Sequence, residues 1–315
     1  MAAPSVKNEK QLNIESLSWG DITWVDIVPP TEKETEYLAQ NYPFHPLDLD
    51  DTLSRKQRPK LDEYKDYLFF VFHLPIYRKQ EQVLTSSQVS VFIGPDYLIT
   101  LHKGELKPLV KLFKECRIDE ESRQEYLGQG SVFLLYRILD RLVDYCLPIL
   151  DKVGDGIEEV EDRIFSDRQR GTVREISRLR RDVIAFRRII WPMRAVIGSL
   201  EPRVRRFIKR DLAVYFGDMV DHLDKIWDGL DEYKEIIEGL SDTYDSLATN
   251  RTNEVVRILT IIATITLPVT IVATVWGMNI PLPFMDSDFA LLYVFLIMLV
   301  VICGILYFLR RIHVV

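Results

Sequence analysis

The sequence predicts an α+β domain, a long helical stalk and two C-terminal transmembrane helices. Three observations point to this fold class. Short runs rich in β-branched and aromatic residues occur early in the chain and are typical of strands. An apolar heptad pattern follows and is typical of long, packed helices. Two runs without a charged residue, 258–276 and 289–309, come last, and about 20 apolar residues span the hydrocarbon core of a bilayer.

Composition restricts the class of protein further. The chain has 315 residues and a formal net charge of -7, and this acidic balance argues against nucleic acid as a partner. Cys116, Cys146 and Cys303 are odd in number and widely spaced, which predicts a reducing compartment and no disulfide framework. Residues 1–13 contain no apolar segment, so we expect no signal peptide.

Residues 1–120 are expected to form a cytosolic α/β domain. The predicted strands lie at 22–28, 67–77, 84–94 and 97–103. Thr31 followed by Glu34 is a capping-box pattern and predicts the start of a helix. The polar stretch 48–67 is interpreted as a connector between helix and sheet.

Residues 121–210 are predicted to form a cytosolic helical hairpin region, and residues 211–257 a stalk helix. The basic clusters between Arg174 and Arg210 have acids nearby, which favours a solvated helix face. In the stalk, apolar residues recur at alternating steps of four and three: Leu212, Phe216, Met219, Leu223, Ile226, Leu230, Tyr233, Ile237, Leu240, Tyr244 and Leu247. Because no helix breaker follows this seam, we predict one continuous helix from about Asp211 to Trp276.

The basic residues around the two runs predict their orientation. Arg251 and Arg257 precede the first span (258–276), and the basic tail 310–315 follows the second (289–309). The connecting loop, 277–288, contains no Lys or Arg. The positive-inside rule therefore predicts a multi-pass protein of the cell (inner or plasma) membrane, with both ends of the chain in the cytoplasm and the loop outside.

A weakly polar stripe runs along the first span. Its members lie three or four residues apart: Asn253, Val256, Thr260, Ala263, Leu267, Thr270, Thr274 and Gly277. Two helices cannot enclose an aqueous path, so a channel would need several copies around an axis. Neutral oxygens suit a cation that keeps its water, and Mg²⁺ dehydrates reluctantly. The alternative is that these residues only help helices to pack.

Two further residues, Pro268 and Asn279, and the terminal Gly277 are interpreted in the same way. Pro268 has no N–H and leaves the carbonyl of Thr264 without its helical donor. Gly277 is expected to end the helix and expose carbonyl oxygens. The carboxamide oxygen of Asn279 would then add a neutral acceptor at the outer mouth of a pore.

The motif Gly277-Met278-Asn279, directly after an apolar helix and before a second span, resembles the signature of the CorA family of magnesium transporters. The longer segment 252–279 is similar to the pore helix of that family. The soluble part also resembles the family in four segments: "FHPLDLDD", "KQRPK", "IIWPMR" and "YFGDMVDH". The resemblance covers nearly the whole chain.

The resemblance implies a homopentameric funnel in the lipid bilayer, with the first span lining the pore. The family's pore positions correspond to Asn253, Leu267, Thr270, Thr274, Gly277, Met278 and Asn279. It also implies a regulatory Mg²⁺ site between neighbouring subunits, formed by Asp51 and Asp218, with Asp50 at a second ion position. A divalent cation bridging two carboxylates removes their repulsion, so cytosolic Mg²⁺ would hold the subunits together and close the pore.

This chain departs from the family at several positions. Ile280, Pro281, Leu282 and Pro283 follow the GMN motif where relatives often have an acid, and the nearest acids are Asp286 and Asp288. Met is common at the position of Leu267 in the family, and Gly at that of Thr274. These differences bear on cation attraction and on the width of the pore.

The function expected from these features is passive Mg²⁺ influx closed by cytosolic Mg²⁺, with Mg²⁺ as both cargo and regulatory ligand. One alternative is transport of Co²⁺, Ni²⁺ or Zn²⁺ by the same architecture, although softer metals favour Cys and His and the first span has neither. A second is a non-transporting, membrane-anchored coiled-coil scaffold, which would tolerate Asn279→Ala. An enzyme is not expected, since the five histidines lie far apart and no nucleophile motif occurs.

Overall fold

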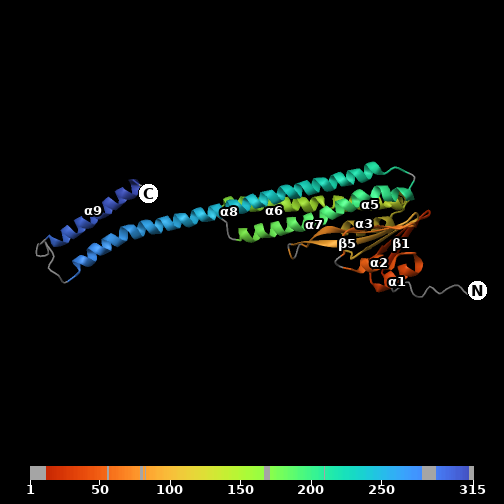
Figure 1. Cartoon of the computed structure of the whole chain (residues 1–315), viewed down its shortest axis with the longest axis horizontal. Helices are drawn as coiled ribbons and strands as arrows, with labels where there is room; N and C mark the ends of the chain where they lie inside the picture. The colour runs from red at the N-terminus through yellow and green to blue at the C-terminus, as the bar shows by residue number, and fades with distance from the viewer. Residues whose placement is uncertain are drawn as a thin grey trace, which may run out of the picture. The chain divides into compact units, whose positions relative to one another are not determined.

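The computed structural model describes residues 12–54, 57–78, 81, 83–166, 171–208, 210–278 and 289–311. The chain divides into two compact units, Met1–Leu240 and Ser241–Val315. Figure 1 shows the elements of both units along the chain.

The N-terminal unit contains a six-stranded sheet. Its strands are β1 (Ile14–Trp19), β2 (Ile22–Ile27), β3 (Lys60–Glu63), β4 (Leu68–Arg78), β5 (Val83–Ile93) and β6 (Tyr97–His102). Their spatial order is β1-β2-β6-β5-β4-β3. All neighbours are antiparallel except β2 and β6, which pair in parallel with Asp26 opposite Thr100. The four predicted strands are confirmed as β2, β4, β5 and β6.

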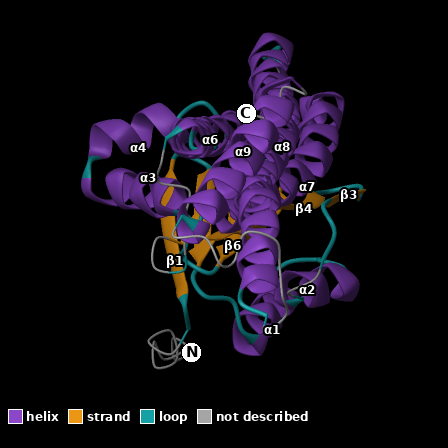
Figure 2. Ribbon diagram, turned by 90° about the vertical axis from the view of Figure 1, so that its left-hand side faces the viewer, coloured by secondary structure: helices purple, strands orange, loops and turns teal. Residues whose placement is uncertain are grey.

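Helices cover both faces of this sheet, as both overall views show (Figures 1 and 2). α1 (Glu32–Asn41) and α2 (Pro46–Leu53) cover one face, against an apolar cluster that includes Phe44, Phe69 and Phe92. α3 (Lys107–Ile118), α5 (Ser131–Asp144) and α7 (Thr172–Val204) lie on the opposite face. The predicted capping box begins α1, and the Thr31 backbone N–H donates to Glu34 at 2.9 Å.

The prediction that residues 48–67 form only a connector is wrong, because the stretch contributes to α2 and forms β3. Pro46 begins α2, and the His45 ring caps it by accepting from the Leu47 N–H at 3.2 Å. Asp48 is buried and accepts from the hydroxyl of Tyr67 at 3.0 Å. The carboxylate of Asp48 is therefore satisfied by a tertiary partner rather than by solvent.

The remaining helices among the described residues are α4 (Glu120–Leu127), α6 (Leu147–Phe165), α8 (Ala213–Trp276) and α9 (Ala290–Arg311), with a short 3-10 turn, η2 (Arg205–Phe207). α8 confirms the predicted continuous helix. Its heptad seam is buried from Leu212 to Leu240, except for the half-buried Tyr233, and becomes half-buried at Tyr244 and Leu247.

In the C-terminal unit, the end of α8 and the whole of α9 are long and apolar enough to cross a membrane. Each helix has one half-buried face. On α8 this face comprises Ile261, Thr264, Ile265, Pro268, Val269, Val272, Val275 and Trp276. On α9 the less exposed residues are Val294, Met298, Val301, Ile302, Ile305 and Leu309. The spacing of three and four is that of one helical face packed against a neighbour.

Candidate ion pathway and regulatory carboxylates

The predicted stripe on α8 is exposed along its whole described length. Asn253, Val256, Thr260, Ala263, Leu267, Thr270, Thr274 and Gly277 are all exposed, and so is Met278. With 3.6 residues per turn, the stripe and the half-buried face point in directions roughly 150° apart. Within the described part of a single chain, the stripe therefore belongs to the exposed surface of α8, which also includes Ile262, Thr266 and Ile271.

The threonine hydroxyls of the stripe all donate to their own helix. Thr260 donates to the carbonyl of Val256 at 2.8 Å, and Thr270 donates to that of Thr266 at 2.8 Å. Thr274 donates to the carbonyl of Thr270 at 2.7 Å. A hydroxyl has one proton and two lone pairs. Each of these oxygens therefore presents only acceptor lone pairs outward, and these match the O–H groups that a hydrated cation presents.

Pro268 and Thr264 lie outside the stripe, on the half-buried face. The hydroxyl of Thr264 donates to the carbonyl of Thr260 at 2.7 Å. The missing N–H of Pro268 thus frees a carbonyl on the packed side of α8. The sequence interpretation favoured a water-facing position for the carbonyl of Thr264, whereas the structure has it on the packed side of α8. A free carbonyl surrounded by protein is also tolerated in a membrane.

α8 ends at Trp276, and Gly277 follows in a turn. The Gly277 N–H bonds to the carbonyl of Ala273 at 3.0 Å. A methyl group at Gly277 would meet that oxygen at 3.4 Å, an ordinary contact, and its backbone is not left-handed. Among the described residues of a single chain, therefore, nothing in the backbone requires glycine at this position. Asn279, Asp286 and Asp288 lie outside the described residues.

Asp51 is held by a lysine of its own chain. The Lys60 ammonium lies 2.5 Å from Asp51 Oδ2 and 2.5 Å from Asp62 Oδ2, with the buried Asp48 at 3.9 Å. Burial alone would lower the pKa of Lys60, but hydrogen bonds to Asp51 and Asp62 hold it above its ordinary value. The side-chain amide of Gln88 donates to the Asp51 carbonyl at 3.2 Å and fixes the end of α2 to β5.

Asp218 lies near the start of α8 and its side chain is 64% exposed. His222, one turn later, lies 4.0 Å from Asp218 and 3.5 Å from Asp144 at the end of α5. Burial, followed by the carboxylate of Asp144, raises the pKa of Asp140 above its ordinary value. Acidic side chains from two helices thus gather around this imidazole.

The single chain does not assemble a metal site from the predicted acids. Among the described residues, no three His, Cys, Asp or Glu side chains are grouped closely enough to hold a metal ion. Asp50 is exposed on α2, and Asp51 is half-buried.

Sequence analysis missed several neighbours of these acids. Lys60 and Asp62 were placed in a connector, and Asp144 and His222 were not singled out. Only the four-residue spacing of Asp218 and His222 on one helix was a readable signal. The other contacts join separate elements and depend on the tertiary fold.

Comparison with known proteins gives a consistent result over nearly the whole chain. Residues 19–311 match the family described as "CorA-like Mg2+ transporter protein". The "Cobalt/magnesium transport protein CorA" of Thermotoga maritima is 33% identical over 262 residues, covering 82% of this chain and 73% of that protein.

Solved structures share the fold at lower identity. The complete structure of the CorA magnesium transporter from Methanocaldococcus jannaschii superposes with a TM-score of 0.80 at 24% identity, covering 94% of this chain and 92% of the other. The full-length CmaX protein gives a TM-score of 0.74 at 18% identity, with 98% and 92% covered. The two apolar C-terminal helices are thus membrane spans, and the chain belongs to the CorA-like Mg²⁺ transporter family.

Proposed function

We propose that this protein is a homopentameric channel for passive Mg²⁺ influx, closed by cytosolic Mg²⁺. Both ends of the chain lie in the cytoplasm, and copies of α8 surround the pore. A double charge gains about 4.6 kcal/mol on entering a cell held at about 100 mV, so no chemical fuel is needed.

The observation that carries this proposal is the exposed stripe of α8, whose threonine oxygens face outward as acceptors. The first-shell waters of a cation donate hydrogen bonds, and Mg²⁺ usually keeps several of them. Neutral acceptors bind such a hydrated ion weakly enough for it to leave again. Gly277 supports the same arrangement, because close approach of a neighbouring copy or of the ion explains a glycine that its own backbone does not require.

Closure by cytosolic Mg²⁺ is assigned to Asp51 and Asp218 on neighbouring copies, with Asp50 nearby. Asp218 is exposed and Asp51 is half-buried, and among the described residues neither belongs to a group of three His, Cys, Asp or Glu side chains that could hold a metal ion. A Mg²⁺ ion between them would have to compete with Lys60 for Asp51. When internal Mg²⁺ falls, the lysine retains the carboxylate and the copies separate, so the product of transport shifts the population between closed and open states.

Mg²⁺ flux into proteoliposomes tests the transport. Thr270→Val keeps the side-chain shape but removes one outward acceptor from every copy, so flux should fall about tenfold or more. Thr264→Val is the matched control, since it removes a back-bonded hydroxyl from the half-buried face, and it should retain most of the flux. Equal effects of the two changes would contradict the assignment of the stripe to the pore.

Flux by the unaltered protein, measured with and without internal Mg²⁺, tests the closure. Internal Mg²⁺ should reduce the flux, and Asp51→Asn together with Asp218→Asn should relieve this inhibition. Absence of flux from folded protein would instead favour a membrane-anchored scaffold. Co²⁺ is the first competing ion to examine, because the Thermotoga relative is named for both cobalt and magnesium. Ni²⁺ and Zn²⁺ follow in the same assay.

A further inference from the structure

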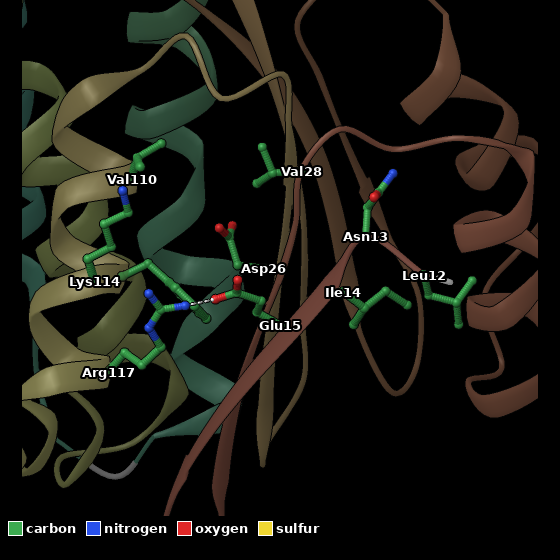
Figure 3. A pocket seen from close by; sticks show the side chains of 10 residues that line it. Leu12, Asn13, Ile14, Glu15, Asp26, Val28, Val110, Lys114 and Arg117 are labelled. Atoms are coloured by element: carbon green, nitrogen blue, oxygen red, sulfur yellow. Dashed lines mark hydrogen bonds and ion pairs between the residues drawn. The ribbon is translucent and has the colours of Figure 1, made fainter. Parts of the chain in front are cut away.

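A pocket of about 420 Å³ lies between the first two strands and α3, apart from the acids discussed above. Known small-molecule pockets have volumes of about 300–1,000 Å³. Its apolar lining includes Val28 after β2, and Val110 and Phe113 of α3. Figure 3 shows these strands facing α3, with Asp26 directed into the space between them.

The buried carboxylate of Asp26 lies at the bottom of this largely apolar pocket. Its side chain is 7% exposed, and its Oδ1 accepts from Thr100 Oγ1 at 2.5 Å and from His102 Nε2 at 3.1 Å. The second oxygen, Oδ2, makes no hydrogen bond within the part of the chain that the structure describes. The carboxylate thus has one oxygen held by two donors and one available to the pocket.

The imidazole of His102 does not neutralise this carboxylate. Its Nδ1 accepts from the Gly104 N–H at 3.0 Å, so the ring proton is on Nε2 and the ring is neutral. A buried carboxylate without a cationic partner is costly. A ligand that places a cation against Asp26 Oδ2 would remove this cost.

The rim of the pocket has the opposite charge. Lys114 is exposed on α3, one turn from Val110. Arg117, on the same face of α3, donates to Glu15 of β1 at 2.6 Å and closes one side of the pocket (Figure 3). The charge pattern is therefore a carboxylate in the floor, an ammonium and a guanidinium paired with Glu15 at the rim, and apolar walls between them.

We propose that this pocket binds a small zwitterion of the amino-acid class with an apolar side chain. Its ammonium would donate to Asp26 Oδ2, its carboxylate would pair with Lys114, and its side chain would pack against the walls. A divalent metal fits less well, because two cations stand at the rim and the described residues hold no cluster of three metal-ligating side chains. The assignment does not depend on the proposed transport.

Calorimetric titration of the full-length protein in detergent with L-leucine and L-phenylalanine tests this assignment. Saturable binding is expected for at least one of them. N-acetyl-L-leucine lacks the ammonium and should bind about tenfold or more weakly, because it loses a charge-assisted hydrogen bond. L-leucinamide keeps the ammonium but lacks the carboxylate, so its affinity should not change in Lys114→Met, whereas that of L-leucine should fall.

Lys107→Met, at the exposed start of α3 and outside the pocket lining, is the matched control and should leave both affinities unchanged. Asp26→Asn should abolish the preference for L-leucine over its acetylated form. If that variant does not fold, the comparison of ligands on the unaltered protein still decides. Equal binding of L-leucine and N-acetyl-L-leucine, competition by Mg²⁺ alone for the same site, or no binding of either amino acid at millimolar concentration would each overturn the proposal.

Discussion

Replacing Lys60 by methionine should make the proposed channel more sensitive to cytosolic Mg²⁺. The lysine ammonium lies 2.5 Å from Asp51 Oδ2 and is a tethered cation at a carboxylate assigned to the regulatory ion. A Mg²⁺ ion that binds Asp51 must weaken or displace this contact. Methionine keeps the length and apolar part of the side chain but removes the competing charge.

The size of the effect follows from the exposure of the pair. The side chains of Lys60 and Asp51 are 28% and 22% exposed, so the pair is partly screened by solvent and is worth about 1 kcal/mol. Since about 1.4 kcal/mol corresponds to a tenfold change in an equilibrium constant, Lys60→Met should lower the half-inhibiting Mg²⁺ concentration about fivefold. Asp62→Asn should act in the opposite direction, because it removes a carboxylate that shares the ammonium with Asp51.

The assay is Mg²⁺ flux into proteoliposomes over a series of internal Mg²⁺ concentrations. Lys65→Met is the charge-matched control, since Lys65 is exposed in the bend between β3 and β4. A double-mutant cycle adds specificity: in an Asp51→Asn background, Lys60→Met should cause no further shift. Equal shifts in Lys60→Met and Lys65→Met, or a shift to higher Mg²⁺, would refute the competition.

Two further predictions concern stability and are measured by thermal unfolding of the full chain. Asp182 accepts a hydrogen bond from the Leu84 N–H at 3.1 Å, and burial raises the pKa of its carboxyl group. The protonated form of Asp182 therefore stabilises the fold fully below about pH 4, the ordinary Asp range, and this contribution is lost as pH rises through the raised pKa. Asp182→Asn should gain stability relative to the unaltered protein as pH rises through that window, and a difference that does not change with pH would contradict this. Gly154→Ala should cost about 1–3 kcal/mol, because the added methyl group would lie 3.0 Å from Cζ of Tyr233 on α8, whereas Gly217→Ala, with open space around it, should be neutral or stabilising.

Periodic features of the sequence predicted the helices and most of the sheet. The seam of α8 is readable because burial along a helix repeats every three or four residues, from Leu212 to Leu240. The stripe from Asn253 to Gly277 is readable for the same reason, and the structure places it on one exposed face. The seam and the stripe both follow from the periodicity of a single helix, so both can be identified from the sequence.

The missed features depend on contacts between distant segments. β3 is only four residues long and polar, and it becomes a strand by pairing with β4, with Lys60 opposite Val71. The contact of Asp26 with His102 joins residues 76 positions apart through the parallel pairing of β2 and β6. The periodic pattern of apolar residues along a sequence does not determine which strands become neighbours in the sheet. For this reason the stripe could be predicted, but the counter-ion of Asp51 and the pocket above Asp26 could not.

The proposed pore must release Mg²⁺ readily, whereas the proposed regulatory site must retain it. The residues of the two sites differ accordingly. Conduction requires that each contact be weak enough for the ion to leave, which the acceptor-only hydroxyls of Thr270 and Thr274 provide without a formal charge. Regulation requires residence at a site, which carboxylates such as Asp51 provide. A carboxylate without a competitor would hold Mg²⁺ over the whole physiological range and keep the channel closed. The contact with Lys60 weakens the site toward the concentrations at which closure is useful, and its removal should therefore change the threshold of inhibition more than the rate of conduction.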